Sequence, residues 1–207
     1  MVQKVDLRKE LKLLHSPSAK EPEIIRVPKF KFLMIDGEGP PETKNFQDAI
    51  QALYNAAYTI KFMWKFDKQI DFPVMALEGL WWLKQGEPFQ MGRREDWCWT
   101  LMILQPRFIT TSALSKAMNK IKSKKEVPAL EKIRLEDFKE GLSVQMLHIG
   151  PYASEPETME KIKLYTSERN LTACGKHHEI YMSDPRRVKP EKMKTILRHA
   201  VSVIAVQ

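Results

Sequence analysis

The sequence has only two cysteines, Cys98 and Cys174, and they are far apart with no CxxC spacing. A metal motif or a disulfide framework needs more cysteines at closer spacing. We therefore expect buried, reduced thiols in a reducing cytoplasm. The sequence also lacks HxH and HExxH patterns, and the adjacent His177 and His178 would point to opposite faces of a strand. We predict neither a metal site nor a cofactor.

Long hydrophobic runs are absent as well. No stretch of about 18 apolar residues is present, so no membrane span is predicted. The N-terminal MVQKVDLRKELKLLH lacks the apolar core of a signal peptide, and we expect a cytoplasmic protein. P-loop, GxGxxG and GxSxG motifs are missing, which disfavours nucleotide cofactors and the α/β-hydrolase scheme.

The charge of the chain is uneven. The formal net charge is +8, and part of it lies in one short stretch, at Lys116, Lys120, Lys122, Lys124 and Lys125. Such a run can contact phosphate backbones, but a solvated helix is the more common explanation. Because no zinc-finger spacing or RNA-binding strand motif accompanies the lysines, we favour the solvated helix and expect no nucleic-acid partner.

What the chain does contain is a duplicated pattern. Its 207 residues, 43% of them hydrophobic, suit one large domain or two small fused units. We predict an N-terminal helix and lead-in over 1–28 and one domain over 29–207. Within that domain we expect a first pseudo-repeat at about 29–108, a charged connector at 109–140 and a second pseudo-repeat at about 141–207.

Each pseudo-repeat reads as strand, helix, strand, strand. In the first, a strand begins at Phe30, and an apolar stripe from Phe46 to Trp64 predicts a helix capped by Asn45. The segments FPVMALEGLWWL and DWCWTLMILQP then predict a hairpin. In the second, LSVQMLHIGPY, a helix with a Ser154–Glu157 capping box, KHHEIYMSDP and KTILRHAVSVI follow in the same order.

The two halves also match in detail. Gly39-Pro40 corresponds to Gly150-Pro151, and Glu78 corresponds to Glu179. Neither half has a large core by itself. We therefore predict an α+β fold in which duplicated strand–helix–strand–strand units form an antiparallel sheet, with helices packed on it and a central ligand groove near the pseudo-twofold axis.

Glu78 and Glu179 each sit in mid-strand among aliphatic and aromatic residues. An unpaired buried carboxylate costs several kcal/mol, so each must face solvent, pair with a donor or line a polar spot in a pocket. The similar placement in both halves favours a pocket. Strand alternation puts His177 and Tyr181 on the face of Glu179.

Aromatic residues are concentrated in the first half. Four of the five tryptophans fall in Trp81–Trp99, either as core or as an aromatic box for a planar or cationic guest. We predict catalytic roles for Glu179, Glu78 and Tyr152. The predicted ligand-binding residues are aromatic or imidazole side chains, namely Trp97, Trp99, Tyr181, His148, Trp82 and Tyr54. A lone histidine such as His148 is more often structural than catalytic.

Several motifs have the character of one family. HIGPYASEPET, GKHHEIYMSDPRR and KTILRHAV, with LMIDGEGPP and LEGLWW upstream, resemble the GyrI-like small-molecule-binding family and its long stand-alone branch, over roughly residues 20–207. The resemblance implies the duplicated fold and a groove whose central acid is a strand glutamate, matched by Glu179. Relatives fused to DNA-binding domains sense bulky cationic or aromatic drugs. Some stand-alone members hydrolyse the cyclopropane of DNA-alkylating natural products, which would be detoxification and antibiotic resistance.

Two functions are therefore in competition. In an enzyme, a glutamate would act as general base on a water, and a tyrosine or a second, protonated glutamate would donate to the oxygen that gains charge. In a binding or sensor module, the same acid and rings would hold a cationic aromatic guest. Inhibition of a topoisomerase is a third hypothesis by family analogy. The partner in the first two cases is a small aromatic molecule, and the oligomeric state stays open.

Overall fold

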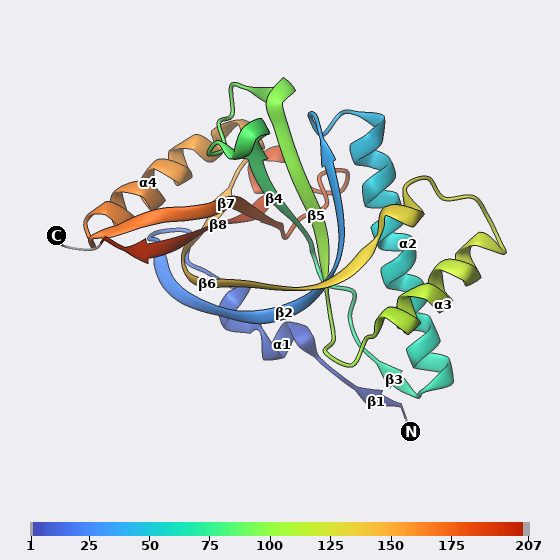
Figure 1. Ribbon diagram of the computed structural model, residues 1–207. Coiled ribbons are helices and arrows are strands. Elements are labelled where there is room, and N and C mark those ends of the chain that lie inside the picture. Colours follow the sequence, from blue (N-terminus) through green and yellow to red (C-terminus); the bar gives the residue numbers. More distant parts are fainter. Residues whose placement is uncertain (1, 205–207) are drawn as a thin grey trace.

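The computed structural model describes residues 2–204. The fold is α+β, with helices packed on a mostly antiparallel sheet, as predicted (Figure 1). In chain order the elements are β1 (Gln3–Lys4), α1 (Leu7–Glu10), β2 (Glu23–Glu38), α2 (Lys44–Asp67), β3 (Ile70–Asp71), β4 (Leu77–Leu83), β5 (Trp97–Gln105), α3 (Thr111–Lys122), β6 (Arg134–Ile149), α4 (Glu155–Ser167), β7 (Leu171–Tyr181) and β8 (Lys194–Val203).

Six strands close into a barrel in the order β2-β5-β4-β7-β8-β6. The first half supplies β2-β5-β4 and the second supplies β6-β8-β7, so both halves use the same internal strand order. This repeated order is what the predicted duplication requires. The halves join twice, through β4 with β7 and through β2 with β6, and both pairs are antiparallel.

The helices divide between the halves. Helix α2 packs on β2 and β5 with α3 against it, whereas α4 packs on β6, β7 and β8. Figure 1 shows α2 and α3 on one side of the molecule and α4 on the other. Helix α2 buries the apolar stripe that the sequence predicted, with Phe46, Leu53 and Ile60 in the main core. The paired strands β4 and β7 thus lie where the two helical layers meet.

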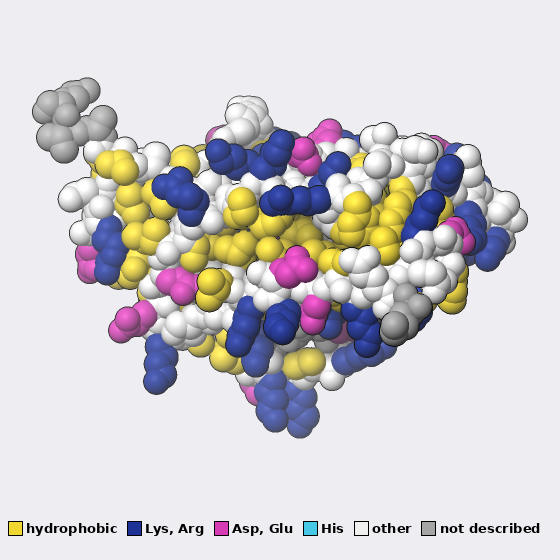
Figure 2. Space-filling model, turned by 90° about the horizontal axis from the view of Figure 1, so that it is seen from below, with side chains coloured by type: hydrophobic (Ala, Val, Ile, Leu, Met, Phe, Trp, Pro, Cys, Tyr) yellow, Lys and Arg dark blue, Asp and Glu magenta, His cyan; other side chains and the backbone are white. Residues whose placement is uncertain are grey.

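The opposite face of the strands carries a smaller apolar cluster. Leu7 and Leu11, at the N-terminal end of the chain, pack there against β2 and β5 residues such as Met102. In the view from below, hydrophobic side chains form a band across the molecule with lysine and arginine around it (Figure 2). The positive charge on this face therefore surrounds an apolar strip.

Some surface expectations can be compared with the structure. The five lysines in and after α3 are exposed, as a solvated helix requires. Both cysteines are free, but Cys174 is exposed and Cys98 only half-buried, so the prediction of buried thiols is wrong. Between residues 2 and 204, no helix has the length and apolar character that crossing a bilayer needs.

Two strands are longer than the sequence indicated. Strand β2 begins at Glu23, not at Phe30, and β6 begins at Arg134, inside the predicted connector. The added residues of β2 pair with residues 141–145 of β6, and the added residues of β6 pair with residues 29–34 of β2. This long β2–β6 pairing closes the barrel. The register passes from Val27 to Lys29 over Pro28, which has no N–H to contribute. A proline is thus tolerated inside a long strand.

Two predicted helix caps are wrong. The cap of α2 is Thr43, whose Oγ1 accepts from the Phe46 N–H at 3.4 Å and donates to the Pro40 carbonyl at 2.8 Å. Asn45 already lies inside the helix. At α4, Ser154 makes no side-chain cap, because its hydroxyl donates to the Pro151 carbonyl at 2.8 Å. Local turn geometry, which spacing does not reveal, decides both cases.

The cap of α2 gives a first prediction. Thr43→Ala should lower the free energy of unfolding by about 1 kcal/mol, because an N-terminal amide of the helix loses its acceptor. The matched control Asn45→Ala should change it by less than about 0.5 kcal/mol. Urea unfolding followed by circular dichroism measures both, and a larger loss for Asn45→Ala would contradict the assignment of the cap.

Candidate functional site

The pairing of β4 with β7 places Glu78 and Glu179 on opposite faces of the sheet. Glu78 stands across from Ile180, and Glu179 stands across from Gly79. Neighbouring positions on paired strands alternate in direction. The expectation that the two glutamates share one groove is therefore wrong. The match between the halves was displaced by one residue, and a one-residue shift moves a side chain to the other face.

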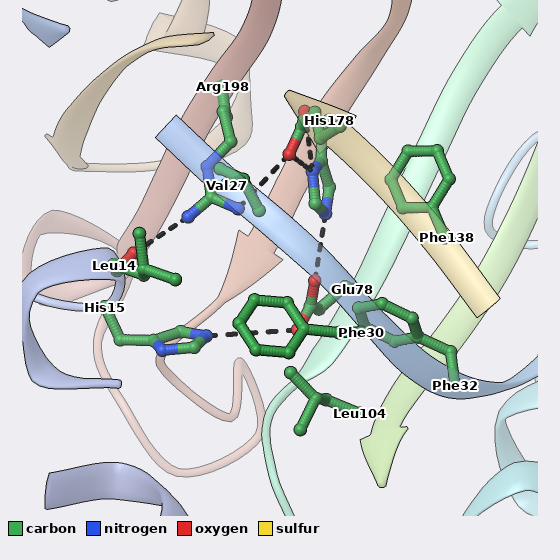
Figure 3. Close-up of a pocket in the computed structure, with 11 residues that line it drawn as sticks. Leu14, His15, Val27, Phe30, Phe32, Glu78, Leu104, Phe138, His178 and Arg198 are labelled. Carbon is green, nitrogen blue, oxygen red and sulfur yellow. Dashed lines mark hydrogen bonds and ion pairs between the residues drawn. The ribbon is translucent and has the colours of Figure 1, made fainter. Parts of the chain in front are cut away.

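Glu78 belongs to a charged cluster on the inner face of the strands. His178 lies between two carboxylates, with Nε2 3.0 Å from Glu78 and Nδ1 3.0 Å from Glu140. Arg198 reaches Glu140 at 3.3 Å and donates to the Leu14 carbonyl at 2.8 Å (Figure 3). All four charged side chains are buried, and two acids balance two bases. The N-terminal segment is thereby fixed to the strands.

Ionisation in this cluster is strongly coupled to folding. Burial alone would lower the pKa of His178, but the carboxylates of Glu140 and Glu78 outweigh it and raise the pKa to about 9. Burial alone would raise the pKa of Glu78, but the imidazoles of His15 and His178 outweigh it and lower the pKa to about 2. The pair is thus ionised across the neutral range.

The hollow beside Glu78 is too small for a drug-sized guest. Its volume is about 10 Å³, the space that one water molecule needs. Glu78 Oε1 has no hydrogen-bond partner within residues 2–204, and His15 Nε2 is 4.0 Å away. Ligand pockets are usually at least about 300 Å³. We therefore interpret Glu78 as part of a structural cluster.

Glu179 lies on the other face, among aromatic side chains. His177 Nε2 is 3.0 Å from Glu179 Oε1. Beside it, Trp81 Nε1 donates to the Tyr181 hydroxyl at 3.1 Å. A Cβ on Gly79 would come within 2.8 Å of the Trp81 nitrogen and 3.0 Å of the Tyr181 oxygen. The glycine opposite Glu179 therefore leaves the room in which this hydrogen bond forms.

A second acid reaches this face from α4. Glu155 is the first residue of the helix and only 1% exposed. Burial, and then the Glu179 carboxylate, raise its pKa to about 9, while a hydrogen bond from Thr195 acts in the opposite direction. Its Oε1 has no partner in the described chain. At neutral pH Glu155 is thus a protonated acid that lies close enough to Glu179 to respond to its charge.

Sequence reasoning missed Glu155. An acid in the first turn of a helix is ordinarily a solvated partner of the helix dipole. The signal that could have found it is its place in HIGPYASEPET, a few residues after Tyr152. Burial by packing of α4 on β7 is what changes its chemistry.

Tyrosines complete the polar lining. Tyr152 is 37% exposed and meets Tyr181 edge to face, with ring centroids 6.2 Å apart. Burial, then the charges of Glu179 and Glu155, raise the pKa of Tyr152 to about 12. Burial and Glu179 also raise the pKa of Tyr181 well above its ordinary value. Both hydroxyls therefore keep their protons at neutral pH and can donate.

Tyr54 approaches the same region from α2. Burial is the main cause that raises its pKa, followed by Tyr58 and by Asp184. Asp184 also raises the pKa of Tyr152. Tyr54 and Tyr181 both pack, partly buried, against the main core.

Two of the predicted tryptophans lie elsewhere. Trp99 is core, with its ring edge-on to Phe46 at 5.1 Å and its Nε1 donating to the Gly39 carbonyl. Trp82 shares the face of Glu78, and the Lys176 ammonium stands 3.2 Å from its ring centroid. These two tryptophans do not surround Glu179.

His148 has a structural environment. Its Nδ1 is 2.9 Å from Thr158 Oγ1 and its Nε2 is 3.2 Å from the Pro151 carbonyl. Nδ1 thus contacts α4, and Nε2 contacts the residue before the turn (η5, Tyr152–Ser154) that precedes this helix. His148 supports the segment that carries Tyr152 and Glu155.

Trp97 and the unpredicted Phe89 pack against Trp81 and His177, which lie on the face of Glu179. Trp97 packs on Trp81 at 5.6 Å and on Phe89 at 5.2 Å. Phe89 comes from the connection between β4 and β5 and stacks flat on His177, at 4.9 Å and 4°. Nothing in the periodicity of the sequence indicates this contact, because residue 89 belongs to neither strand.

The inner cluster predicts how stability depends on pH. The pKa of His178 is about 9 when folded and ordinarily 6.5, so its contribution, about 3 kcal/mol, is complete below 6.5 and lost as pH rises through 9. The pKa of Glu78 is about 2 and ordinarily 4.5, so its contribution is lost as pH falls through that range.

Unfolding free energies from urea titrations between pH 3 and 10 measure both limbs. In Glu78→Gln the alkaline decline should begin at lower pH, because one of the two carboxylates that hold the His178 charge is gone. A stability that stays flat up to pH 10 would contradict the charged state of His178.

Comparison with known families and solved structures identifies relatives of this chain. A family model described as "GyrI-like small molecule binding domain" matches residues 20–200. A conserved protein of Listeria innocua, described as uncharacterized, is 41% identical with a TM-score of 0.89, over 96% of this chain and 100% of that one. A hydrolase from Listeria innocua is 40% identical with a TM-score of 0.87, over 97% of this chain and 100% of the other.

More distant structures share the fold alone. The C-terminal domain of EcmrR is 11% identical with a TM-score of 0.55, over 88% of this chain and 98% of that domain. No curated protein matches the chain. The match of the family model over nearly the whole sequence is decisive, and the chain belongs to the family of GyrI-like small-molecule-binding domains.

Proposed function

We propose that the protein binds bulky aromatic molecules at the Glu179 face and hydrolyses a strained cyclopropane ring in them, as a detoxifying enzyme. The observation that carries this proposal is the pair Glu155 and Glu179. Burial and the charge of Glu179 raise the pKa of Glu155 to about 9, so one acid is held protonated beside a carboxylate. Two titratable groups whose environments differ in this way are suited to act as acid and base.

The residues divide the chemistry as follows. Glu179 accepts a proton from a water molecule while the water oxygen bonds to a ring carbon. The carbon–carbon bond of the cyclopropane breaks, and its electron pair moves into a conjugated carbonyl group. The oxygen that gains charge takes the proton of Glu155, with Tyr152 and Tyr181 as further donors. The product is the substrate plus one water.

Aromatic side chains would bind the rest of the substrate. Trp81, Tyr152 and Tyr181 offer ring surface beside the acids. Burying ~300 Å² of apolar ligand surface would contribute at most ~7 kcal/mol before the costs of association. Glu179 is only 6% exposed, so entry requires Tyr152 or the connection that carries Phe89 to move.

The relatives support the reaction class. Two structures of hydrolases from Listeria innocua are each 40% identical over nearly all of this chain. That similarity supports hydrolysis as the reaction class. The choice of a cyclopropane as substrate rests on the Glu155–Glu179 pair, because opening a strained ring needs only modest acid–base catalysis.

The first test is the removal of each acid. Glu179→Gln should lose about 10²- to 10⁴-fold in turnover because the general base is gone. Glu155→Gln should lose less turnover, because the amide N–H can still donate a hydrogen bond to the oxygen that gains charge, although it cannot transfer a proton. The control Glu157→Gln, on the exposed side of α4, should match the wild type. Mass spectrometry of a cyclopropane-bearing alkylator detects a product heavier by one water, and circular dichroism checks folding.

An unchanged rate in Glu179→Gln would remove this residue from the mechanism. Equal rates in Glu155→Gln and the wild type would remove the proposed acid.

A non-catalytic sensor or sequestering module for cationic aromatic compounds is the second candidate. The observation that favours it is the negative field of Glu179, which helps to raise the pKa of Glu155, Tyr152 and Tyr181. A carboxylate among rings attracts organic cations.

Titration calorimetry separates the two. A sensor should bind an aromatic cation about tenfold more tightly than its neutral isostere, because the carboxylate adds charge pairing to cation–π attraction, and lose this preference in Glu179→Gln. An enzyme for a neutral electrophile should show no such preference. Equal affinity for both ligands in the wild type would count against the sensor.

A further inference from the structure

Two histidines, His177 and His199, extend a line of hydrogen bonds from the Glu179 carboxyl group. Glu179 Oε1 is 3.0 Å from His177 Nε2, and His177 Nδ1 is 2.6 Å from His199 Nε2. His177 lies on β7 and His199 lies directly opposite on β8, just after a bulge in the pairing. Phe89 covers the His177 ring. A carboxylate and two imidazoles thus form one line of hydrogen bonds.

The positions of the protons follow from the chemistry of the groups. A carboxylate can only accept, so His177 Nε2 must carry a hydrogen and donate it to Glu179. In a neutral His177 the other nitrogen, Nδ1, is then an acceptor, and His199 Nε2 must donate to it. Burial is the main cause that lowers the pKa of His199 to about 3, and a positive charge on His177 would lower it further, so His199 is neutral. Both hydrogen bonds therefore point toward Glu179.

We propose that His199 and His177 are positioning residues, in which His199 fixes the Nε2–H tautomer of His177 and His177 holds Oε1 of Glu179. Oε2 is then the oxygen left to receive the proton of the attacking water. The effect on rate rests on the proposed hydrolysis, but the tautomer does not. The tautomer of one imidazole nitrogen is set by the bond that the other makes.

Other charged groups around this line are accounted for. Glu179 is faced by Tyr181 from its own strand, by Glu155 from α4 and by Tyr152 from η5. The charges of Glu140 and His178, in the inner cluster, also act on the pKa of His199, in opposite directions. Both residues are already paired, Glu140 with His178 and with Arg198. Within the described chain, His199 is thus the group that can set the His177 proton.

The tautomer can be measured in the ligand-free protein. In the wild type, ¹⁵N NMR of the imidazoles should show His177 with hydrogen on Nε2 and none on Nδ1. His199→Phe removes the donor and should give a mixture of tautomers. His199→Gln keeps an N–H donor and should restore the Nε2–H form. The control His15→Phe alters a histidine on the other face and should leave His177 unchanged.

A wild-type His177 with hydrogen on Nδ1 would overturn the proposal. So would a tautomer that is the same in the wild type and in folded His199→Phe. Should His199→Phe fail to fold, His199→Gln with a Nδ1–H tautomer of His177 overturns it as well.

Steady-state kinetics measure kcat, KM and the pH profile, and the pattern expected for a positioning residue differs from that of a residue that only packs. With a cyclopropane-bearing alkylator, His199→Phe should lower kcat by about ten- to a hundredfold, less than the loss known for a wrong tautomer in a catalytic triad, because the ring can still turn to donate. KM should change little, and the acid limb of the pH profile should shift to higher pH. His199→Gln should recover most of kcat.

The outcomes separate the two proposals. No turnover in the wild type, with the expected tautomers, refutes the hydrolysis and confines the histidines to holding Glu179 for binding. Turnover in the wild type with an unaltered kcat and pH profile in His199→Phe refutes the positioning role alone.

Discussion

The alternation of side chains along the β4–β7 pair is the constraint on which the molecule depends. Two adjacent histidines, His177 and His178, each serve a carboxylate on their own face of the sheet. One face is sealed by the N-terminal segment and holds the Glu78 cluster. The other lies between α2 and α4 and holds Glu179. A shift of the pairing by one residue would exchange these environments.

The two faces of the sheet stabilise their buried carboxyl groups in different ways. On the inner face, two carboxylates are matched by His178 and Arg198, so every charge has a partner and the cluster fixes structure. On the outer face, the Glu179 carboxylate is accompanied by the neutral Glu155, whose Oε1 has no partner within residues 2–204. Both faces hold shifted pKa values and a carboxyl oxygen without a partner in the described chain, but on the inner face the acids are paired with bases, whereas on the outer face Glu155 is held neutral beside a second acid, which is the arrangement that acid–base chemistry uses. This contrast is why we assign chemistry to Glu179 and structure to Glu78.

Much of the fold follows from local patterns. The stripe from Phe46 to Trp64 predicted α2, and the two apolar segments around KQGEP predicted the β4–β5 hairpin. Alternation also predicted that Tyr181 and His177 share the face of Glu179, which the hydrogen bonds confirm. These features depend on residues close together in sequence, for which periodicity is informative.

The parts that were missed depend on tertiary packing. The register that sets Gly79 opposite Glu179 joins strands 100 residues apart, and a repeat match cannot resolve a shift of one residue. Burial of Glu155 requires α4 to pack on β7, and Phe89 reaches His177 from an irregular connection. The sequence left Trp81 as either core or part of an aromatic box, and its hydrogen bond to Tyr181 follows only from the pairing of β4 with β7.

The central claim is that one glutamic acid beside Glu179 keeps its proton at neutral pH, and isotope-edited infrared spectroscopy tests it most directly. The account predicts a protonated carboxyl band at pH 7 that disappears as pH rises through about 9. This band should be missing in Glu155→Gln and present in Glu78→Gln. A spectrum in which all glutamates are ionised at pH 7, or a band that survives in Glu155→Gln, would contradict it.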